Sequence, residues 1–157
     1  MNHITLVQYN MNLHQSCCEH TGPQLYMIGV GSRTWTDREP IMHWLLQQQI
    51  WNPVVVSGGA GGADRLVIDC ARELGMHWEV FPADWNNRQL ITPQGSKLAG
   101  FHRNMAMVDE IRSRPGEVIA HVFAESVLSD GRPSSPGSSH VHSYLEAVGI
   151  SCEVTAR

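Results

Sequence analysis

The sequence predicts a doubly wound α/β fold of the Rossmann-like type, with a mostly parallel sheet and helices on both faces. Short apolar segments alternate with segments of helical periodicity, each apolar segment ends in small or polar residues, and one such end is a glycine-rich turn before a helix. Strands that are apolar throughout are typical of parallel sheets, because helices cover both of their faces. Right-handed crossovers place the helices there.

The alternation is regular from residue 25 onward. Residues 25–30 are a first apolar run, and a helix is expected to begin near Asp37 with Pro40 in its first turn. Residues 53–56 form the next predicted strand. Apolar residues then recur at helical spacing over 63–74, which indicates a second helix.

The second half of the chain continues this pattern. The expected elements are a strand at 77–81, a helix at 101–111, a strand at 117–124, a helix at 141–148 and a strand at 150–154. A loop rich in Gly, Ser and Pro at 126–139 precedes the last helix. Ser138 or Ser139 is placed to cap that helix.

Residues 1–24 are expected to form an extension before one domain at 25–157. The extension contains a short apolar segment at 4–7 and a Thr-Gly-Pro breaker at 21–23. Such a segment predicts either an added edge strand or a poorly ordered terminus. The length of 157 residues fits a single hydrophobic core.

Composition argues against several classes of protein. The net charge is −4, and the ten arginines and one lysine form no basic run, which disfavours nucleic acid as the main partner. No segment approaches the roughly 20 apolar residues of a membrane span, and the start lacks the layout of a signal peptide. We therefore expect a cytoplasmic protein without membrane contact.

The sequence also gives no reason to expect a metal or another cofactor. The four cysteines have no metal-ligand spacing. His140 and His142 are two positions apart, so they point in different directions on a helix. A P-loop lysine and a nucleophilic serine elbow are both missing from the sequence.

The glycine-rich turn at 57–64 is the strongest candidate for a binding site. It reads Ser-Gly-Gly-Ala-Gly-Gly-Ala-Asp between a strand and a helix. Glycines let the backbone approach a ligand, and a helix N-terminus attracts anions. The alternatives are a purely structural turn and a carboxylate that only complements the helix dipole. The residues predicted to bind phosphate here are Ser57, Gly58, Gly59, Ala60, Gly61, Gly62 and Asp64.

Other loops are expected to share a rim with this turn, because ligands of doubly wound sheets bind beyond the carboxyl ends of the strands. An arginine can hold a phosphate through two N–H groups, and a tryptophan can stack on a base. The alternatives are an ordinary surface loop, an exposed ion pair and the edge of the core. The further candidates for ligand binding are Gly31, Ser32, Arg33, Trp85, Arg103 and Asn104.

Four motifs resemble a known family. They are Gly-Ser-Arg-Thr-Trp-Thr-Asp at 31–37, Val-Val-Ser-Gly-Gly-Ala-Gly-Gly-Ala-Asp-Arg at 55–65, Phe-Pro-Ala-Asp-Trp at 81–85 and Arg-Asn-Met-Ala-Met-Val at 103–108. Because these four motifs occur in this order over residues 25–154, the chain is similar to the YspA-type family of the SLOG superfamily (the DUF2493 domain). The resemblance implies a Rossmann-like fold related to the LOG phosphoribohydrolases and to the DNA-processing protein DprA, found in bacteria and their phages.

The leading functional prediction is binding or sensing of a nucleotide or nucleotide-derived ligand. The LOG enzymes carry a catalytic glutamate in a P-G-G-x-G-T-x-x-E turn, and the turn here has Asp64 nearby instead. The resemblance therefore implies phosphate binding more directly than cleavage. Many related enzymes are dimers or larger, which makes a homo-oligomer a further expectation.

Two alternatives remain open. One is a LOG-like phosphoribohydrolase or N-glycosidase, in which Arg33 or Arg103 would hold the phosphate and Asp64 or Asp84 would stabilise the oxocarbenium charge. The other is DprA-like binding of single-stranded DNA, suggested by the similar Ser-Gly-Gly turn.

Overall fold

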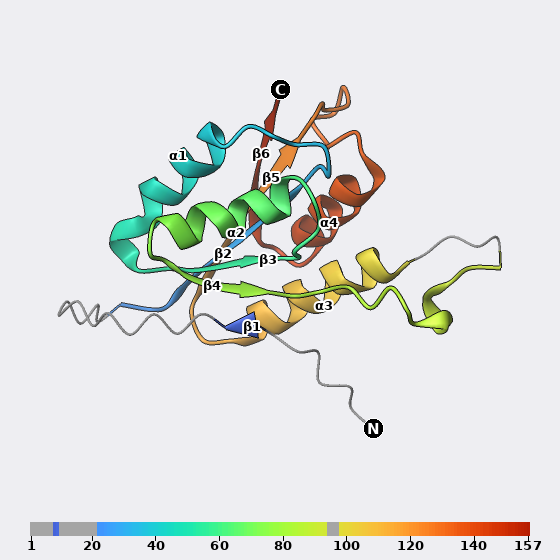
Figure 1. The fold of residues 1–157 in the computed structure, drawn as a ribbon, viewed down its shortest axis with the longest axis horizontal. Helices are drawn as coiled ribbons and strands as arrows, with labels where there is room; N and C mark the ends of the chain where they lie inside the picture. Colours follow the sequence, from blue (N-terminus) through green and yellow to red (C-terminus); the bar gives the residue numbers. More distant parts are fainter. Residues whose placement is uncertain (1–7, 10–21, 94–97) are drawn as a thin grey trace.

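The computed structural model describes residues 8–9, 22–93 and 98–157, which form a sheet between two layers of helices (Figure 1). No helix in these ranges is long and apolar enough to cross a membrane. The elements are β1 (Gln8–Tyr9), β2 (Leu25–Gly31), α1 (Glu39–Gln48), η1 (Gln49–Trp51), β3 (Val54–Ser57), α2 (Ala63–Glu73), β4 (His77–Val80), η2 (Arg88–Leu90), α3 (Ala99–Ser113), β5 (Glu117–Ala124), α4 (Pro136–Ala147) and β6 (Ser151–Ala156).

The predicted doubly wound fold is confirmed. The strand order is β1-β4-β3-β2-β5-β6, and β2 to β6 are all parallel. The chain moves outward through β3 and β4 on one side of β2, and through β5 and β6 on the other. The winding therefore reverses between β2 and β5, the position at which open α/β sheets bind ligands.

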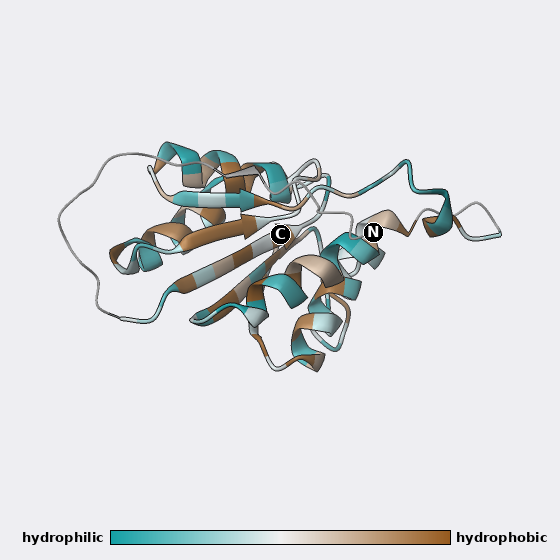
Figure 2. Ribbon diagram, turned by 90° about the horizontal axis from the view of Figure 1, so that it is seen from below, coloured by the Kyte–Doolittle hydropathy of each residue, from teal (hydrophilic) through white to brown (hydrophobic). Residues whose placement is uncertain are grey.

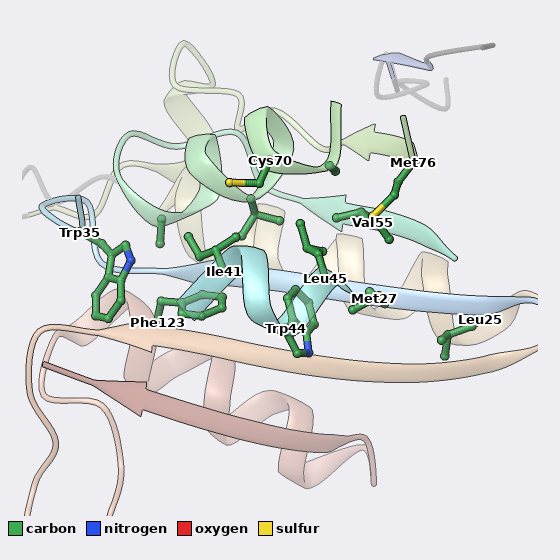
Figure 3. Close-up of a cluster of buried hydrophobic side chains, with 13 residues drawn as sticks. Leu25, Met27, Trp35, Ile41, Trp44, Leu45, Val55, Cys70, Met76 and Phe123 are labelled. Carbon is green, nitrogen blue, oxygen red and sulfur yellow. The ribbon is translucent and has the colours of Figure 1, made fainter. Parts of the chain in front are cut away.

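Each face of the sheet has its own hydrophobic core. Helices α1 and α2 cover one face, where Trp44, Leu45 and Val67 pack on β2 and β3 (Figure 3). Helices α3 and α4 cover the other, where Met107 and Leu145 pack among residues of the same strands. In Figure 2 the strands in the middle of the sheet are coloured largely as hydrophobic and lie between the two helical layers. Burial on both faces explains why the central strands β2 and β3 are almost entirely apolar, whereas β4 and the edge strand β6 contain charged residues.

The centre of β2 is closely covered by helices. A Cβ atom at Gly29 would lie 2.8 Å from Val67 of α2 and 3.0 Å from the ring of Trp44 of α1. The amide of Ala63, the first residue of α2, donates to the carbonyl of Ser32 at 2.9 Å. These contacts fix the glycine-rich turn against the loop that follows β2.

An antiparallel strand closes one edge of the sheet. Gln8 pairs with Val80 and Tyr9 with Glu79, so β1 lies beside β4. The apolar segment at 4–7, which the sequence suggested as an edge strand, lies outside the described residues.

Helix α4 begins earlier than the sequence predicted. The expected caps, Ser138 and Ser139, are wrong, because Ser135 is the N-cap and its side chain accepts from the amide of Ser138 at 3.4 Å. Pro136 occupies the first turn, where its missing N–H has no consequence. Gly137 and Ser138 are therefore helical residues at the N-terminus of α4.

Candidate functional site

Two adjoining cavities lie at the carboxyl edge of the sheet. The first, here called the inner cavity, has a volume of about 460 Å³ and lies between the loop after β2, helix α3 and the start of α4. The second, the glycine-turn cavity, has a volume of about 420 Å³ and lies over residues 58–61 and 82–83. Their walls share Arg33, Ala60, Trp85 and Arg103. The inner cavity lies where the winding of the sheet reverses.

Three glycines of the turn are required by the fold itself. Gly59 and Gly62 have φ angles of 69° and 73°, which other residues rarely adopt. A side chain at Gly62 would collide with the backbone of Ser32 and Arg33, and one at Gly58 would collide with the guanidinium of Arg103. These glycines therefore have a structural role in the tight turn, and residues 58–61 of the same turn also line the glycine-turn cavity.

Asp64 holds the turn together from inside. Its carboxylate accepts from the amide of Gly31 at 3.1 Å and from the amide of Ala60 at 3.3 Å, and it lies 3.6 Å from Nη2 of Arg103. The side chain is only 4% exposed. Burial raises the pKa of Asp64, while Arg103 and the two amides oppose that rise. This carboxylate thus joins the loop after β2, the glycine turn and α3.

Arg103 crosses beneath the glycine turn. Its guanidinium donates to the carbonyl of Gly58, to the carbonyl of Phe81 at 3.2 Å, and from Nε to the side chain of Asn104 at 2.8 Å. Burial lowers its pKa, and the neighbouring charge of Asp64 raises it. Arg103 forms part of both cavity walls, but its N–H groups already serve main-chain oxygens and Asp64.

Arg33 is the more available cation. It is exposed, and no carboxylate in the described part of the chain forms an ion pair with it. Its guanidinium carbon lies 5.4 Å from the ring centroid of Trp85, and the indole is 40% exposed. Together these two side chains form the boundary between the cavities. They present a charged group and an aromatic surface at the same place.

A network of hydrogen bonds holds the loop that carries Arg33. Nη2 of Arg157 donates to the carbonyl of Thr34 at 3.2 Å and to Glu125 at 2.6 Å. The hydroxyl of Thr34 donates to the same carboxylate at 3.0 Å and lies 3.0 Å from the hydroxyl of Ser32. Arg157, which directly follows β6, therefore positions the loop that forms part of the wall of the inner cavity.

The start of α4 brings a further hydroxyl to the inner cavity. Ser138 is one of the residues that line the cavity, is 3% exposed, and has a buried hydroxyl with no hydrogen-bond partner within the described residues. Buried hydroxyls are normally paired. An unpaired one beside a helix N-terminus is suited to an acceptor on a bound ligand.

The predicted site residues fall into three groups. Those in the cavity walls are Gly31, Ser32, Arg33, Gly58, Gly59, Ala60, Gly61, Asp64, Trp85, Arg103 and Asn104. Ser57, the buried last residue of β3, and Gly62, at the N-cap of α2, line neither cavity. Asp84, one of the two proposed catalytic carboxylates, is exposed and lines neither cavity. Asp64 does line the inner cavity, with its oxygens engaged as described.

Sequence reasoning did not assign several wall residues to the site. They are Val30, Thr34, Gly100, Phe101, Ser135, Pro136, Gly137, Ser138 and Val141. The one available signal was the segment Ser-Ser-Pro-Gly-Ser-Ser at 134–139, whose proline followed by glycine is compatible with a helix start.

Comparison of the chain with protein-family models, curated proteins and solved structures found no match. The site is therefore interpreted from its own geometry.

Proposed function

We propose that this protein binds a nucleotide or a nucleotide-derived ligand in the two cavities at the carboxyl edge of its sheet. The observation that carries the proposal is the pair of adjoining cavities that share an unpaired cation, Arg33, and an aromatic surface, Trp85. They lie at the position where doubly wound sheets bind ligands. The motifs that resemble the YspA-type SLOG family agree with this proposal.

The chemistry of the walls suits a phosphate and a ring. The amides of Gly59 and Gly61 have no hydrogen-bond partner within the described residues, and they lie before the N-terminus of α2. Unpaired amides at a helix N-terminus attract phosphate oxygens. The ring of Trp85 and the side chain of Phe101 offer apolar surface to a base.

Arg33 must supply a large part of the affinity. A helix dipole contributes about 0.3–1 kcal/mol at an exposed site, whereas micromolar binding needs about 8 kcal/mol. A charged hydrogen bond contributes roughly 1.5–3 kcal/mol. The arginine, the hydroxyls and the buried ring surface must therefore act together with the turn.

The geometry favours binding over cleavage of a glycosidic bond. Both oxygens of Asp64 accept main-chain amides, and its charge faces Arg103. A carboxylate engaged in this way is poorly placed to stabilise an oxocarbenium ion. Asp84 lies outside the cavities. We therefore assign the site a binding or sensing role.

Thermal unfolding with a panel of ligands tests this function. The panel contains nucleoside mono-, di- and triphosphates, cyclic nucleotides, NAD and ADP-ribose. At a hundredfold excess over Kd, binding adds about 2.7 kcal/mol, which raises the Tm by roughly 5–10 °C. The Arg33→Ala variant should lose about half of the shift or more, and Arg132→Ala, which breaks an exposed pair with Asp130, should keep it. No shift with any ligand would contradict the proposal.

A further inference from the structure

Two glycines in the cavity walls are not explained by the fold. Among the described glycines from residue 25 to the end, the others either have a positive φ or would bring a Cβ within 3.4 Å of another atom. Gly61 and Gly137 have neither property. A Cβ at Gly61 would meet nothing closer than the carbonyl oxygen of Arg33 at 4.0 Å, and one at Gly137 would meet nothing within 4 Å.

Both positions face the proposed ligand site. Gly61 lines the glycine-turn cavity, and Gly137 lines the inner cavity in the first turn of α4. Glycine destabilises a helix relative to alanine, so a fold-only explanation would favour a side chain at Gly137. A glycine that no protein atom requires is explained if a ligand approaches the backbone there. The two cavities offer one such point each.

A second observation at α4 points to a ligand. Ser138, next to Gly137, is a lining residue of the inner cavity, and its buried hydroxyl has no hydrogen-bond partner among the described residues. The amide of Gly137 also donates to no protein atom in the described part of the chain. A hydroxyl and an amide at a helix N-terminus form a donor pair for an anionic oxygen. The amides near Gly61 form a comparable group before α2.

The charge of the walls matches two anionic groups. The Asp64 and Arg103 charges offset each other, which leaves Arg33 as the unpaired cation of the described walls. Each helix N-terminus contributes roughly half an elementary charge, so α2, α4 and Arg33 together offer about two positive charges. Two phosphate groups that each carry a single negative charge, as in the diphosphate bridge of ADP-ribose, would balance them.

We propose that the ligand is a nucleotide with two phosphate groups that lies across both cavities. One phosphate contacts the main chain at Gly61, the other contacts Gly137 and Ser138, and the ring lies against Trp85, which both cavities share. This inference rests on the proposed function and specifies its ligand class.

Calorimetric titration of three variants tests the inference. Gly61→Ala and Gly137→Ala add a methyl group at each contact point, and Ser143→Ala is the control on α4 outside both cavities. The probes are AMP, ADP, adenosine 3′,5′-bisphosphate and ADP-ribose, or their counterparts with the base that the thermal panel selects.

The expected result has three parts. At least one two-phosphate probe binds the wild type at least tenfold more tightly than AMP. Each glycine variant loses this tighter binding of the two-phosphate probe. The affinity for AMP falls in at most one of the two variants. The Tm of both free variants equals or exceeds that of the wild type, because alanine restricts the unfolded chain and no atom of the described residues opposes its methyl group.

Other outcomes overturn the inference. If AMP binds as tightly as every two-phosphate probe, the ligand does not need both cavities, although the proposed function stands. If either glycine variant binds the two-phosphate probes as tightly as the wild type does, or has a lowered Tm, the glycine at that position is not explained by a ligand contact. If no nucleotide binds the wild type, the proposed function fails as well.

Discussion

The two arginines of the cavity walls differ in what surrounds their charge. Arg103 is 8% exposed, faces a buried carboxylate, and donates to carbonyls from two loops. Arg33 is exposed, its guanidinium lies over the Trp85 ring, and it belongs to a loop held by other residues. The difference separates two roles that the sequence could not separate. One arginine builds the site, and the other is available to a ligand.

This comparison predicts that replacing the two arginines has different consequences for the protein. Loss of Arg103 should damage the fold and, through it, the site. Loss of Arg33 should damage binding alone. The predictions below test this division from the largest expected effect to the smallest.

Replacing Arg103 with methionine should lower stability most. The change leaves the Asp64 carboxylate buried without its cation, a situation that costs about 3–5 kcal/mol. For a chain of this length the Tm should fall by roughly 10 °C or more. Thermal unfolding followed by circular dichroism measures the change.

A second variant sharpens that test. The double variant Asp64→Asn with Arg103→Met removes both charges, so it should recover part of the lost Tm. If the double variant is no more stable than Arg103→Met, the buried pair is not the cause of the loss.

Replacing Arg33 with alanine should leave the fold intact and weaken the binding of the ligand. The side chain is exposed, so the Tm of the free protein should stay within about 1–2 °C of the wild type. Nucleotide affinity should fall by roughly 10- to 100-fold, which equals the loss of one charged hydrogen bond. Arg33→Lys should recover only part of it, because lysine lacks the planar fork. Unchanged nucleotide affinity in Arg33→Ala would contradict the binding role assigned to Arg33.

Replacing Arg157 with alanine should have a smaller effect on the same loop. Arg157 contacts the carbonyl of Thr34 and the hydroxyl of Thr36, both beside the wall that carries Arg33. Without it, nucleotide affinity should fall by roughly three- to tenfold, about the value of one hydrogen bond. Glu125→Gln should act in the same direction. A loss of affinity equal to that of Arg33→Ala would mean that Arg157 contacts the ligand itself.

The smallest expected effect is a change in how the stability of the protein depends on pH. It concerns a buried histidine that lines neither cavity. His121 of β5 packs against the rings of Trp44 and Phe123, which also contact each other, and its Nε2 is 2.8 Å from the hydroxyl of Thr155. Burial lowers the pKa of His121, and exposed Glu153 only partly opposes this.

The sign of the pH effect follows from that direction. A histidine whose pKa is lower in the folded state stabilises the neutral form, so stability is complete above about pH 6.5 and declines as the pH falls. His121→Phe should flatten this decline between about pH 6.5 and 5 without abolishing it, because His140 also has a pKa lowered by burial. Urea midpoints at several pH values measure the slope, and an unchanged slope would remove His121 as its cause.

The sequence predicted the order of the elements better than the site. Continuous apolar runs and helical spacing depend on residues close in the chain, so the strands β2 to β6 and the helices were located by pattern. The start of α4 was placed wrongly because two serines close to the true cap, Ser135, have the same local chemistry. Only the observed hydrogen bond distinguishes them.

The roles of the site residues could not be read from local pattern. Arg103 and Asp64 are 39 positions apart, and their pairing depends on how α3 packs beneath the glycine turn. The sequence left a capping role and a ligand role open for Asp64. In the structure Asp64 lies in the first turn of α2, and its carboxylate accepts from the amides of Gly31 and Ala60, contacts that local pattern does not reveal. Which glycines a ligand requires also depends on neighbours distant in the chain.

The shared indole of Trp85 makes the site its own optical reporter. It is 40% exposed at the boundary of the two cavities, whereas the other four tryptophans, Trp35, Trp44, Trp51 and Trp78, line neither cavity. A nucleotide stacked on Trp85 would displace water from that ring and quench its emission, while the indoles outside the cavities give a constant background. Ligand arrival could then be timed by stopped-flow fluorescence without a label, and the signal should vanish in Trp85→Phe.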